Sequence, residues 1–261
     1  MSVDSRPVAL VTGASRGIGA EIARQLAARG VRIAVHCNAN RSAAEATLSQ
    51  LAGSGHATVA ADLADVAATT RLWGEVVGTF GAIDILVNNA GIYLNHPPLA
   101  STAHDWLQAW RLTLDTNLHG PAHLSLLAAQ AMALRAERHG SGFGRGRIVN
   151  ISSRGAFRGE PDAPAYAASK AGLNALSQSL ARALAPVGVY VYCLAPGWVE
   201  TDMATATLAG PDGDGIRAQH PLGRLSRPDE LAHAAVYCAL DAPAAMTGGI
   251  IDVNGASYLR S

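Results

Sequence analysis

A tyrosine and a lysine stand four positions apart in the segment YAASK, which runs from Tyr166 to Lys170. The small residues between them permit a helix, on which positions i and i+4 lie on the same face. An ammonium group near a phenol favours the ionised phenol, so this pair could transfer a proton. A tyrosine–lysine pair is also common on protein surfaces, and the rest of the sequence must separate the two interpretations.

Two polar residues earlier in the chain could act with this pair. Ser153 follows an apolar run that is typical of a strand, and it precedes Tyr166 by thirteen residues. Asn117 lies inside a long helical pattern. Each has an ordinary alternative, Ser153 as a turn residue and Asn117 as a polar residue that bends a helix. The candidate catalytic residues are Asn117, Ser153, Tyr166 and Lys170.

Short apolar runs rich in β-branched residues alternate with longer helical patterns along the 261 residues. The predicted strands are Val8–Thr12, Val31–Val35, Ala57–Ala61, Ile83–Asn89, Arg147–Ser152, Val189–Ala195 and Gly249–Val253. The predicted helices are Ile18–Arg29, Ser42–Leu51, Val66–Phe80, Asp105–Arg138, Ala163–Pro186 and Pro228–Leu240. This alternation predicts an α/β fold, a doubly wound parallel sheet of about seven strands with helices on both faces. Because no linker or repeat interrupts it, residues 1–261 are predicted to form one domain.

The first predicted strand leads into a helix through the glycine-rich segment VTGASRGIG, Val11–Gly19. Glycines in such a turn let phosphate groups approach the backbone, and the helix N-terminus presents free N–H groups and a positive dipole. The spacing is GxxxGxG rather than GxGxxG, and glycine in a strand–helix turn is often only structural. The position at the start of an α/β chain favours nucleotide binding. The residues expected to contact the cofactor there are Gly13, Ser15, Arg16, Gly17, Ile18 and Gly19.

Further polar residues follow other predicted strands, where ligands of α/β sheets gather. Asp62 could accept a hydrogen bond from an adenine amino group, or it could cap a helix. The segment NNAG, Asn88–Gly91, could hold a loop against a cofactor or form a tight turn. The segment PGWVET, Pro196–Thr201, follows the sixth predicted strand in the same way. The additional cofactor contacts expected from these segments are Asp62, Leu63, Asn89, Ala90, Gly91, Pro196, Gly197, Val199 and Thr201, besides Tyr166 and Lys170.

The end of the second predicted strand bears on which nicotinamide cofactor would bind. An acidic residue there would hold the ribose 2′-hydroxyl of NAD, and the segment VHCNANRS has none. Arg16, Asn38 and Arg41 could instead face a 2′-phosphate, although Arg16 could also be a solvated turn residue. The sequence therefore favours NADP(H), with NAD(H) as the alternative.

These motifs together resemble the short-chain dehydrogenase/reductase family of the single-domain, Rossmann-like, NAD(P)-binding type. The matching pieces are TGASRGIG, NNAG, Asn117, ISS, YAASK and PGWVET, which occur in the family's order over almost the whole chain. The resemblance implies that Tyr166 is a general acid and base and that Ser153 donates a hydrogen bond to the substrate oxygen. It also implies that Lys170 binds the nicotinamide ribose and that Asn117 holds a proton-relaying water.

A tyrosine can serve as an acid near neutral pH only if its pKa falls from the ordinary value of about 10. A fall of three units corresponds to about 4 kcal/mol of extra phenolate stabilisation. We expect the charge of Lys170, together with that of an oxidised nicotinamide, to lower the pKa of Tyr166 toward neutrality.

Two later segments, PLGRLSRPDELA and TGGIIDVNGA, resemble those of the 3-oxoacyl-[acyl-carrier-protein] reductases. That likeness implies reduction of a 3-oxoacyl thioester by NADPH, in fatty acid biosynthesis, with acyl carrier protein as a partner. Val187 departs from it, because those reductases tend to carry a basic residue there. The basic loop Arg138–Arg147 could compensate, since acyl carrier protein is acidic.

Other activities are compatible with the same motifs. A dehydrogenase or reductase of a sugar, a steroid or another small secondary alcohol is the main alternative. An epimerase or dehydratase of the extended family would be expected to carry a further C-terminal domain, and a non-catalytic NADP sensor to have lost the tyrosine or the lysine. Arg154, Arg158 and Glu160 could line the substrate pocket or lie in a solvated loop.

The resemblance also concerns mobility and assembly. Residues 200–228 resemble a mobile substrate lid. The family is usually tetrameric through the two long helices on either side of the fifth strand, and Asp105–Arg138 and Ala163–Pro186 suit such contacts. A homotetramer is therefore expected.

Composition excludes several other classes. Twenty basic and 20 acidic residues give a formal net charge of +0, which does not favour nucleic acid as a partner. No apolar run is long enough to cross a membrane, and the N-terminus lacks a signal-peptide pattern, so a cytoplasmic protein is expected. The 3 cysteines and 9 histidines are scattered; His119 and His123 form the only i, i+4 histidine pair, and no metal site is predicted.

Overall fold

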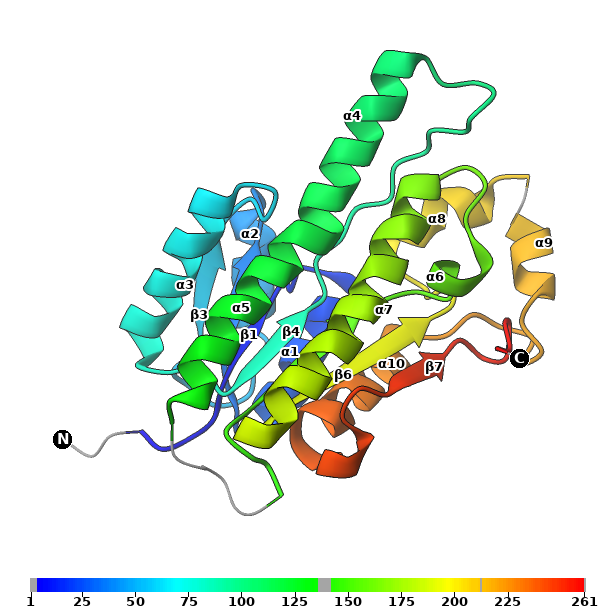
Figure 1. Cartoon of the computed structure of the whole chain (residues 1–261). Helices are drawn as coiled ribbons and strands as arrows, with labels where there is room; N and C mark the ends of the chain where they lie inside the picture. The colour runs from blue at the N-terminus through cyan, green and yellow to red at the C-terminus, as the bar shows by residue number, and fades with distance from the viewer. Residues whose placement is uncertain (1–3, 136–141, 212, 261) are drawn as a thin grey trace.

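The short apolar runs of the sequence form one parallel sheet in a computed structural model of the chain, which describes residues 4–135, 142–211 and 213–260. The strands are β1 Val8–Val11, β2 Arg32–Cys37, β3 Ala57–Ala60, β4 Ile85–Asn88, β5 Gly146–Ile151, β6 Val189–Pro196 and β7 Ile250–Val253. They are hydrogen-bonded in the order β3-β2-β1-β4-β5-β6-β7, and every pairing is parallel (Figure 1). The predicted doubly wound sheet is confirmed, with strand bounds within two residues of the expected ones.

Helices cover both faces of this sheet. The main ones are α1 Gly17–Ala28, α2 Arg41–Leu48, α3 Val66–Phe80, α4 Ala103–Leu114, α5 Gly120–Ala133, α7 Pro164–Leu184 and α10 Pro228–Val236. Shorter helical segments are α6 Gly155–Arg158, α8 Asp202–Ala209, α9 Gly213–Ala218, η2 Ala185–Val187 and η4 Ala244–Met246, and π-helical turns occur at η1 Asp115–His119 and η3 Tyr237–Asp241. Helices α1, α2 and α10 share one buried apolar cluster, and α3, α5 and α7 share the other.

Alternate residues of the inner strands β1, β2, β4, β5 and β6 enter the two clusters. On β4, Ile85 and Val87 join the cluster of α1 and α10, whereas Leu86 joins the cluster of α3 and α5. Because both faces are covered, a parallel strand is buried throughout and its sequence is a continuous apolar run. This explains why composition alone located the strands.

The predicted helix Asp105–Arg138 is continuous over residues 105–133, but it is not a regular α-helix throughout. Its described part is divided into α4, the π-helical turn η1 and α5, and residues 136–138 lie outside the described residues. Pro121 has no N–H group to donate to the carbonyl four residues earlier, which belongs to Asn117, so the regular helical ladder is interrupted there. The interruption places Asn117 in the π-helical turn.

The described residues contain no helix that is long and apolar enough to cross a membrane. They also contain no group of three or more His, Cys, Asp or Glu side chains that could hold a metal ion. The cysteines Cys37, Cys193 and Cys238 are buried and free, so they behave as small apolar core residues.

Candidate active site

The glycine-rich turn forms one end of a cavity of about 470 Å³ at the carboxyl ends of the strands. Gly13 and Gly17 adopt φ angles of 63° and 56°, in the left-handed region that favours glycine. A Cβ atom on Gly13 would lie 2.9 Å from the Cα of Ala90, and one on Gly19 would overlap Asn89 and the Gly13 carbonyl. The turn therefore has no room for side chains and presents backbone to the cavity.

Helix α1 begins at this turn with unsatisfied donors. Its N-cap residue, Arg16, makes no side-chain capping hydrogen bond. The first N–H groups of a helix have no partner within the helix, and the helix dipole makes this end positive. The arrangement can accept the phosphates of a nucleotide.

Asn89 and Thr12 hold the turn against the end of β4. The Asn89 side chain donates to the carbonyls of Thr12 and Gly13, at 2.9 and 3.2 Å. The Thr12 hydroxyl oxygen accepts from the backbone N–H groups of Asn89 and Ala90. The predicted role of the NNAG segment in holding a loop is thus met by Asn89, whereas Asn88 is buried and bonds to Ser125 and Asn150.

His36, near the end of β2, is a contact that sequence analysis missed. Its Nδ1 accepts from the backbone N–H of Gly13 at 3.0 Å, so its Nε2 carries the proton that is donated to the carbonyl of Ala61 at 3.1 Å. Burial lowers the pKa of His36 to about 4, and the ring is neutral at physiological pH. His36 therefore joins the glycine-rich turn to the end of β3 without adding charge.

Most of the predicted cofactor contacts line the cavity. They are Gly13, Ser15, Arg16, Gly17, Ile18, Gly19, Asn38, Asp62, Leu63, Asn89, Ala90, Gly91, Pro196, Gly197, Val199 and Thr201. Arg41 does not: it is the exposed first residue of α2 and lies outside the lining. One carboxylate oxygen of Asp62 accepts from the N–H of Ala64, while α3 is capped by Asp65 instead.

Three of the four candidate catalytic residues meet at the other end of the cavity. Ser153 follows β5, and Tyr166 and Lys170 lie one turn apart on α7, as the i, i+4 spacing predicts. The Ser153 oxygen accepts from the N–H of Gly155 at 3.0 Å, and the Ser153 hydroxyl also forms a hydrogen bond with Tyr166. Lys170 Nζ donates to the carbonyl of Ile151 at 2.8 Å and lies 5.7 Å from the centroid of the Tyr166 ring.

The protein's own residues, without the charge of a nicotinamide, do not lower the pKa of Tyr166 as expected. Burial raises the pKa of Tyr166 to about 12, and a hydrogen bond with Ser153 opposes the rise. Burial also lowers the pKa of Lys170 to about 8, so its amine is still mostly charged at neutral pH. The physical reason is that removal of the phenol from water outweighs a cation that is bonded to Ile151 rather than to the phenol oxygen.

Asn117, the fourth candidate, is buried behind the cavity and not on its lining. Its Oδ1 accepts from the N–H of Ile92 at 2.8 Å, and its Nδ2 donates to the carbonyl of Ile92 and the hydroxyl of Ser169. A Cβ atom on Gly91 would lie 3.3 Å from Asn117 Oδ1 and 3.5 Å from Lys170 Nζ, so these two side chains approach each other beside Gly91. The Asn117 amide therefore clamps the loop after β4.

Comparison with known proteins agrees with this geometry. A family model described as short chain dehydrogenase matches residues 7–211. The chain belongs to this family. It is 38% identical over 252 residues to the 3-oxoacyl-[acyl-carrier-protein] reductase FabG of Escherichia coli (strain K12), covering 97% of each chain. It is 39% identical over 255 residues to D-threitol dehydrogenase of Mycolicibacterium smegmatis, covering 97% of this chain and 93% of that protein.

These two relatives differ in activity at nearly equal identity, so the likeness establishes a short-chain dehydrogenase and not its substrate. A third, the reductase FabG of Staphylococcus aureus (strain Mu50), is 35% identical over 253 residues, with 96% of this chain and 98% of that protein covered.

Arg154 and Glu160 line the cavity of this dehydrogenase, and Arg158 lies outside the lining. Tyr93 also lines it, with its ring 4.9 Å from that of Tyr166. Tyr93 follows the NNAG loop, and no periodicity or motif marked it in the sequence. The wall beside the reacting group is thus partly aromatic and partly charged.

The two ends of the predicted lid, residues 200–228, are hydrogen-bonded to each other beside the cavity. Val199 and Ser226 form an isolated bridge, and the N–H of Glu200 donates to the carbonyl of Ser226 at 2.9 Å. Segments α8 and α9 lie within the lid. This pairing fixes the first and last residues of the predicted lid relative to each other.

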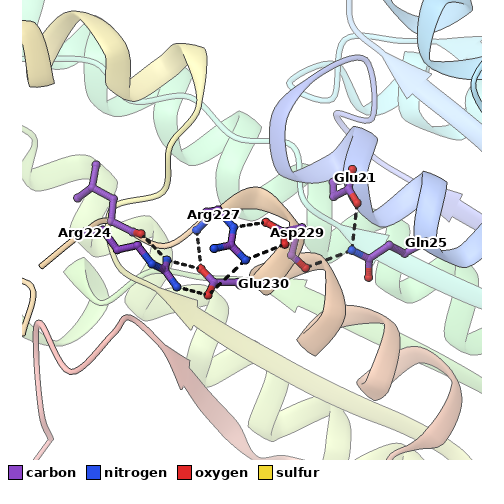
Figure 2. Close-up of polar contacts among 7 residues, drawn as sticks. Glu21, Gln25, Arg224, Arg227, Asp229 and Glu230 are labelled. Atoms are coloured by element: carbon purple, nitrogen blue, oxygen red, sulfur yellow. Dashed lines mark hydrogen bonds and ion pairs between the residues drawn. The ribbon is translucent and has the colours of Figure 1, made fainter. Parts of the chain in front are cut away.

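An ion-pair network anchors the return end of the lid to the nucleotide side (Figure 2). Arg224 binds both carboxylate oxygens of Glu230, at 2.8 and 2.6 Å, and Glu230 also accepts from the N–H of Arg227. Gln25, on α1, donates to the carbonyl of Asp229 at 3.1 Å. Through these bonds the segment PLGRLSRPDELA is tied to the helix that starts at the glycine-rich turn.

Proposed function

We propose that this short-chain dehydrogenase is an NADP(H)-dependent enzyme that reduces a ketone to a secondary alcohol. The observation that carries the proposal is one continuous cavity with a phosphate-accepting helix start at one end and Ser153, Tyr166 and Lys170 at the other. A ligand that has phosphates at one end and a reactive ring at the other would contact both groups of lining residues. A reduction at that ring's end needs a hydrogen-bond donor and an acid, and both are present.

The residues of the nucleotide end fit a dinucleotide. The free N–H groups at the start of α1 would hold its phosphates, and the second oxygen of Asp62 would accept from the adenine amino group. Arg16 and Asn38 line the cavity where a ribose 2′-phosphate would lie, and neither is acidic, which favours NADP(H). The bound nicotinamide supplies the hydride for the reaction.

Each residue of the reacting end would have its own role in the reduction. Ser153 would donate its O–H to the ketone oxygen as negative charge develops there. Tyr166 would deliver the proton, and its raised pKa keeps it protonated and suited to that direction, because an alkoxide is a far stronger base than a phenolate. Lys170 would hold its charge close to the reacting groups, and Asn117 would position the loop that separates the two ends.

For the substrate, we infer a 3-oxoacyl thioester, on the strength of the reductases named above. A small secondary alcohol is the second candidate, because D-threitol dehydrogenase is equally similar. The basic loop expected to attract acyl carrier protein falls partly on residues 136–141, outside the described residues. Arg147 does not contribute a surface charge: it is buried, its guanidinium lies 5.0 Å from the Phe143 ring centroid, and it donates to the carbonyl of Cys238.

We also infer a homotetramer. Leu107 and Leu112 on α4 and Leu126 on α5 are exposed apolar side chains, which an assembly would cover. Helix α4 reaches beyond the sheet (Figure 1), so it is accessible to another copy of the chain. Light scattering should give the mass of four chains; the mass of a single chain would contradict the assembly.

The function is tested by following oxidation of NADPH and of NADH with a short 3-oxoacyl thioester and, in the reverse direction, with a small polyol. Tyr166→Phe should lower kcat by about 10³-fold, since a positioned acid contributes about 10²–10⁴-fold. NADPH binding, followed by fluorescence, should persist in that variant. Turnover by Tyr166→Phe at the wild-type rate would exclude the proposed reaction, and faster oxidation of NADH than of NADPH would exclude the cofactor preference.

A further inference from the structure

Arg154 is a buried cation at the reacting end of the cavity. It directly follows Ser153, lines the cavity and is only 2% exposed. Burial lowers its pKa to about 10, so the guanidinium remains charged at neutral pH. Among the described residues no acidic side chain forms an ion pair with it; its partners are the Ser257 carbonyl at 3.3 Å and Gln219 Oε1 at 2.9 Å.

A second guanidinium reaches the same amide oxygen. Arg158 Nη1 donates to Gln219 Oε1 at 3.2 Å, so two cations share one neutral acceptor. The carboxylate of Glu160 lies 3.7 Å from Arg158 Nε. A carboxylate has the shape of the Gln219 carboxamide but carries a full negative charge, and it binds guanidinium groups with charge-assisted hydrogen bonds. The position of Gln219 Oε1 is therefore better suited to a carboxylate oxygen than to an amide.

His220, the next residue of the lid, gives an independent sign that a polar partner is missing here. Both of its ring nitrogens are buried and have no hydrogen-bond partner among the described residues. Burial lowers the pKa of His220, and the charge of Arg154 lowers it further. Buried polar groups without partners are uncommon and destabilising, so this corner of the site is better satisfied by an added polar group.

We propose that the ketone substrate carries a carboxylate that displaces the Gln219 carboxamide oxygen and binds both Arg154, on the cavity lining, and Arg158, which lies beside it outside the lining. This inference rests on the proposed function and narrows its substrate to an oxo acid, or to a 3-oxoacyl compound with a further carboxylate. The carboxylate undergoes no bond change: the carbonyl carbon gains a hydride and its oxygen gains the proton of Tyr166. Arg154 and Arg158 orient the ketone beside Ser153.

Arg154 could instead serve only to join the lid to the C-terminal tail, through Gln219 and Ser257. That role makes a different prediction. Loss of a structural anchor would impair acidic and neutral ketones equally, whereas loss of a carboxylate site would impair acidic ketones alone. The test therefore depends on a pair of substrates that differ only in this charge.

The experiment compares 3-oxobutanoate with its ethyl ester during NADPH oxidation. The wild-type enzyme should have the larger kcat/KM for the acid. Gln219→Glu places a fixed carboxylate between the two guanidiniums, and it should raise KM for the acid at least tenfold relative to the ester. Gln50→Glu is the matched control, because Gln50 also accepts from an arginine but its partner is Arg24, on α1, and not Arg154 or Arg158; it should leave the ratio of the two substrates unchanged.

A binding measurement makes the test independent of turnover. Calorimetric titration of 3-oxobutanoate into the NADP⁺-loaded wild-type protein should show saturable binding that is at least tenfold weaker in Gln219→Glu and in Arg158→Gln. Absence of saturable binding to the wild type, a preference for the ester, or an equal loss with both substrates would overturn the carboxylate site. Tyr166→Phe separates the two proposals: it should retain carboxylate binding, and if it also retained turnover, only the proposed reaction would fail.

Discussion

The two ends of the cavity differ in the chemical groups that form them. At the nucleotide end, the glycine-rich turn is fixed by neutral side chains, Asn89 and the ring of His36, and the charged Arg16 and Asp62 line the cavity beside it. The reacting end contains buried charges, with Lys170 only 4% exposed and Arg154 only 2% exposed. The first end should therefore depend on shape and little on pH, and the second should depend on charge.

This difference agrees with the relatives. A backbone cradle recognises phosphates, which every dinucleotide carries, so it can serve many substrates unchanged. A buried cation discriminates among substrates, because its desolvation must be compensated by a particular partner. The chain's substrate specificity is accordingly expected at Arg154 and around it, and its family membership at the glycine-rich turn.

The largest loss of NADPH affinity is expected from adding a side chain to the glycine-rich turn. Gly19→Ala should raise the Kd for NADPH about 100-fold, because the added Cβ would overlap Asn89 and the Gly13 carbonyl, and overpacking costs about 1–3 kcal/mol. Fluorescence titration measures the change. Gly78→Ala is the control, since a Cβ at this position in α3 meets no atom within 4 Å; equal Kd values for the two variants would contradict a shape-determined end.

A smaller effect is expected from the neutral ring that supports the turn. His36→Phe leaves the Gly13 N–H and the Ala61 carbonyl without partners, and the Kd for NADPH should rise about tenfold, in line with about 1–3 kcal/mol for an unsatisfied buried group. His36→Gln can still accept and donate, so it should recover most of the affinity. If His36→Phe bound NADPH as tightly as the wild type, the ring would have no positioning role.

How much of this was predictable differs between the two ends as well. The strands and the glycine-rich turn follow from local patterns, because buried parallel strands are apolar throughout and a phosphate-binding turn needs glycine. His36 was missed because its value arises from contacts with Gly13 and Ala61, which are distant in the sequence. Arg41 was expected from its charge and lies outside the lining for the same reason: sequence position does not give side-chain placement.

At the reacting end, the expected residues Ser153, Tyr166 and Lys170 line the cavity, whereas Asn117 does not and Tyr93 was not expected. The i, i+4 spacing placed Tyr166 and Lys170 on one face, and both line the cavity. The direction of the pKa of Tyr166 was wrong because burial depends on the complete tertiary structure. The division of the helix at Asn117 was likewise missed, although Pro121 was a signal for it.

The smallest predicted effect separates the two ends by pH. Lys170 loses its proton as pH rises through about 8, so kcat/KM should fall about twofold between pH 7 and 8, while the Kd for NADPH changes less. The free energy of unfolding should change in the opposite direction. The pKa of Lys170 in the folded protein, about 8, lies below its ordinary value of 10.5. Between these pH values the unfolded chain binds more protons than the folded protein, so the free energy of unfolding rises with pH. His36 gives the acid counterpart, since its folded pKa of about 4 lies below 6.5 and the free energy of unfolding should fall as pH decreases between them. Lys170→Met should flatten the alkaline arm of the stability profile and His36→Gln the acid arm, measured by urea unfolding from pH 4 to 10; an alkaline arm unchanged in Lys170→Met would show that the charge at the reacting end belongs to another group.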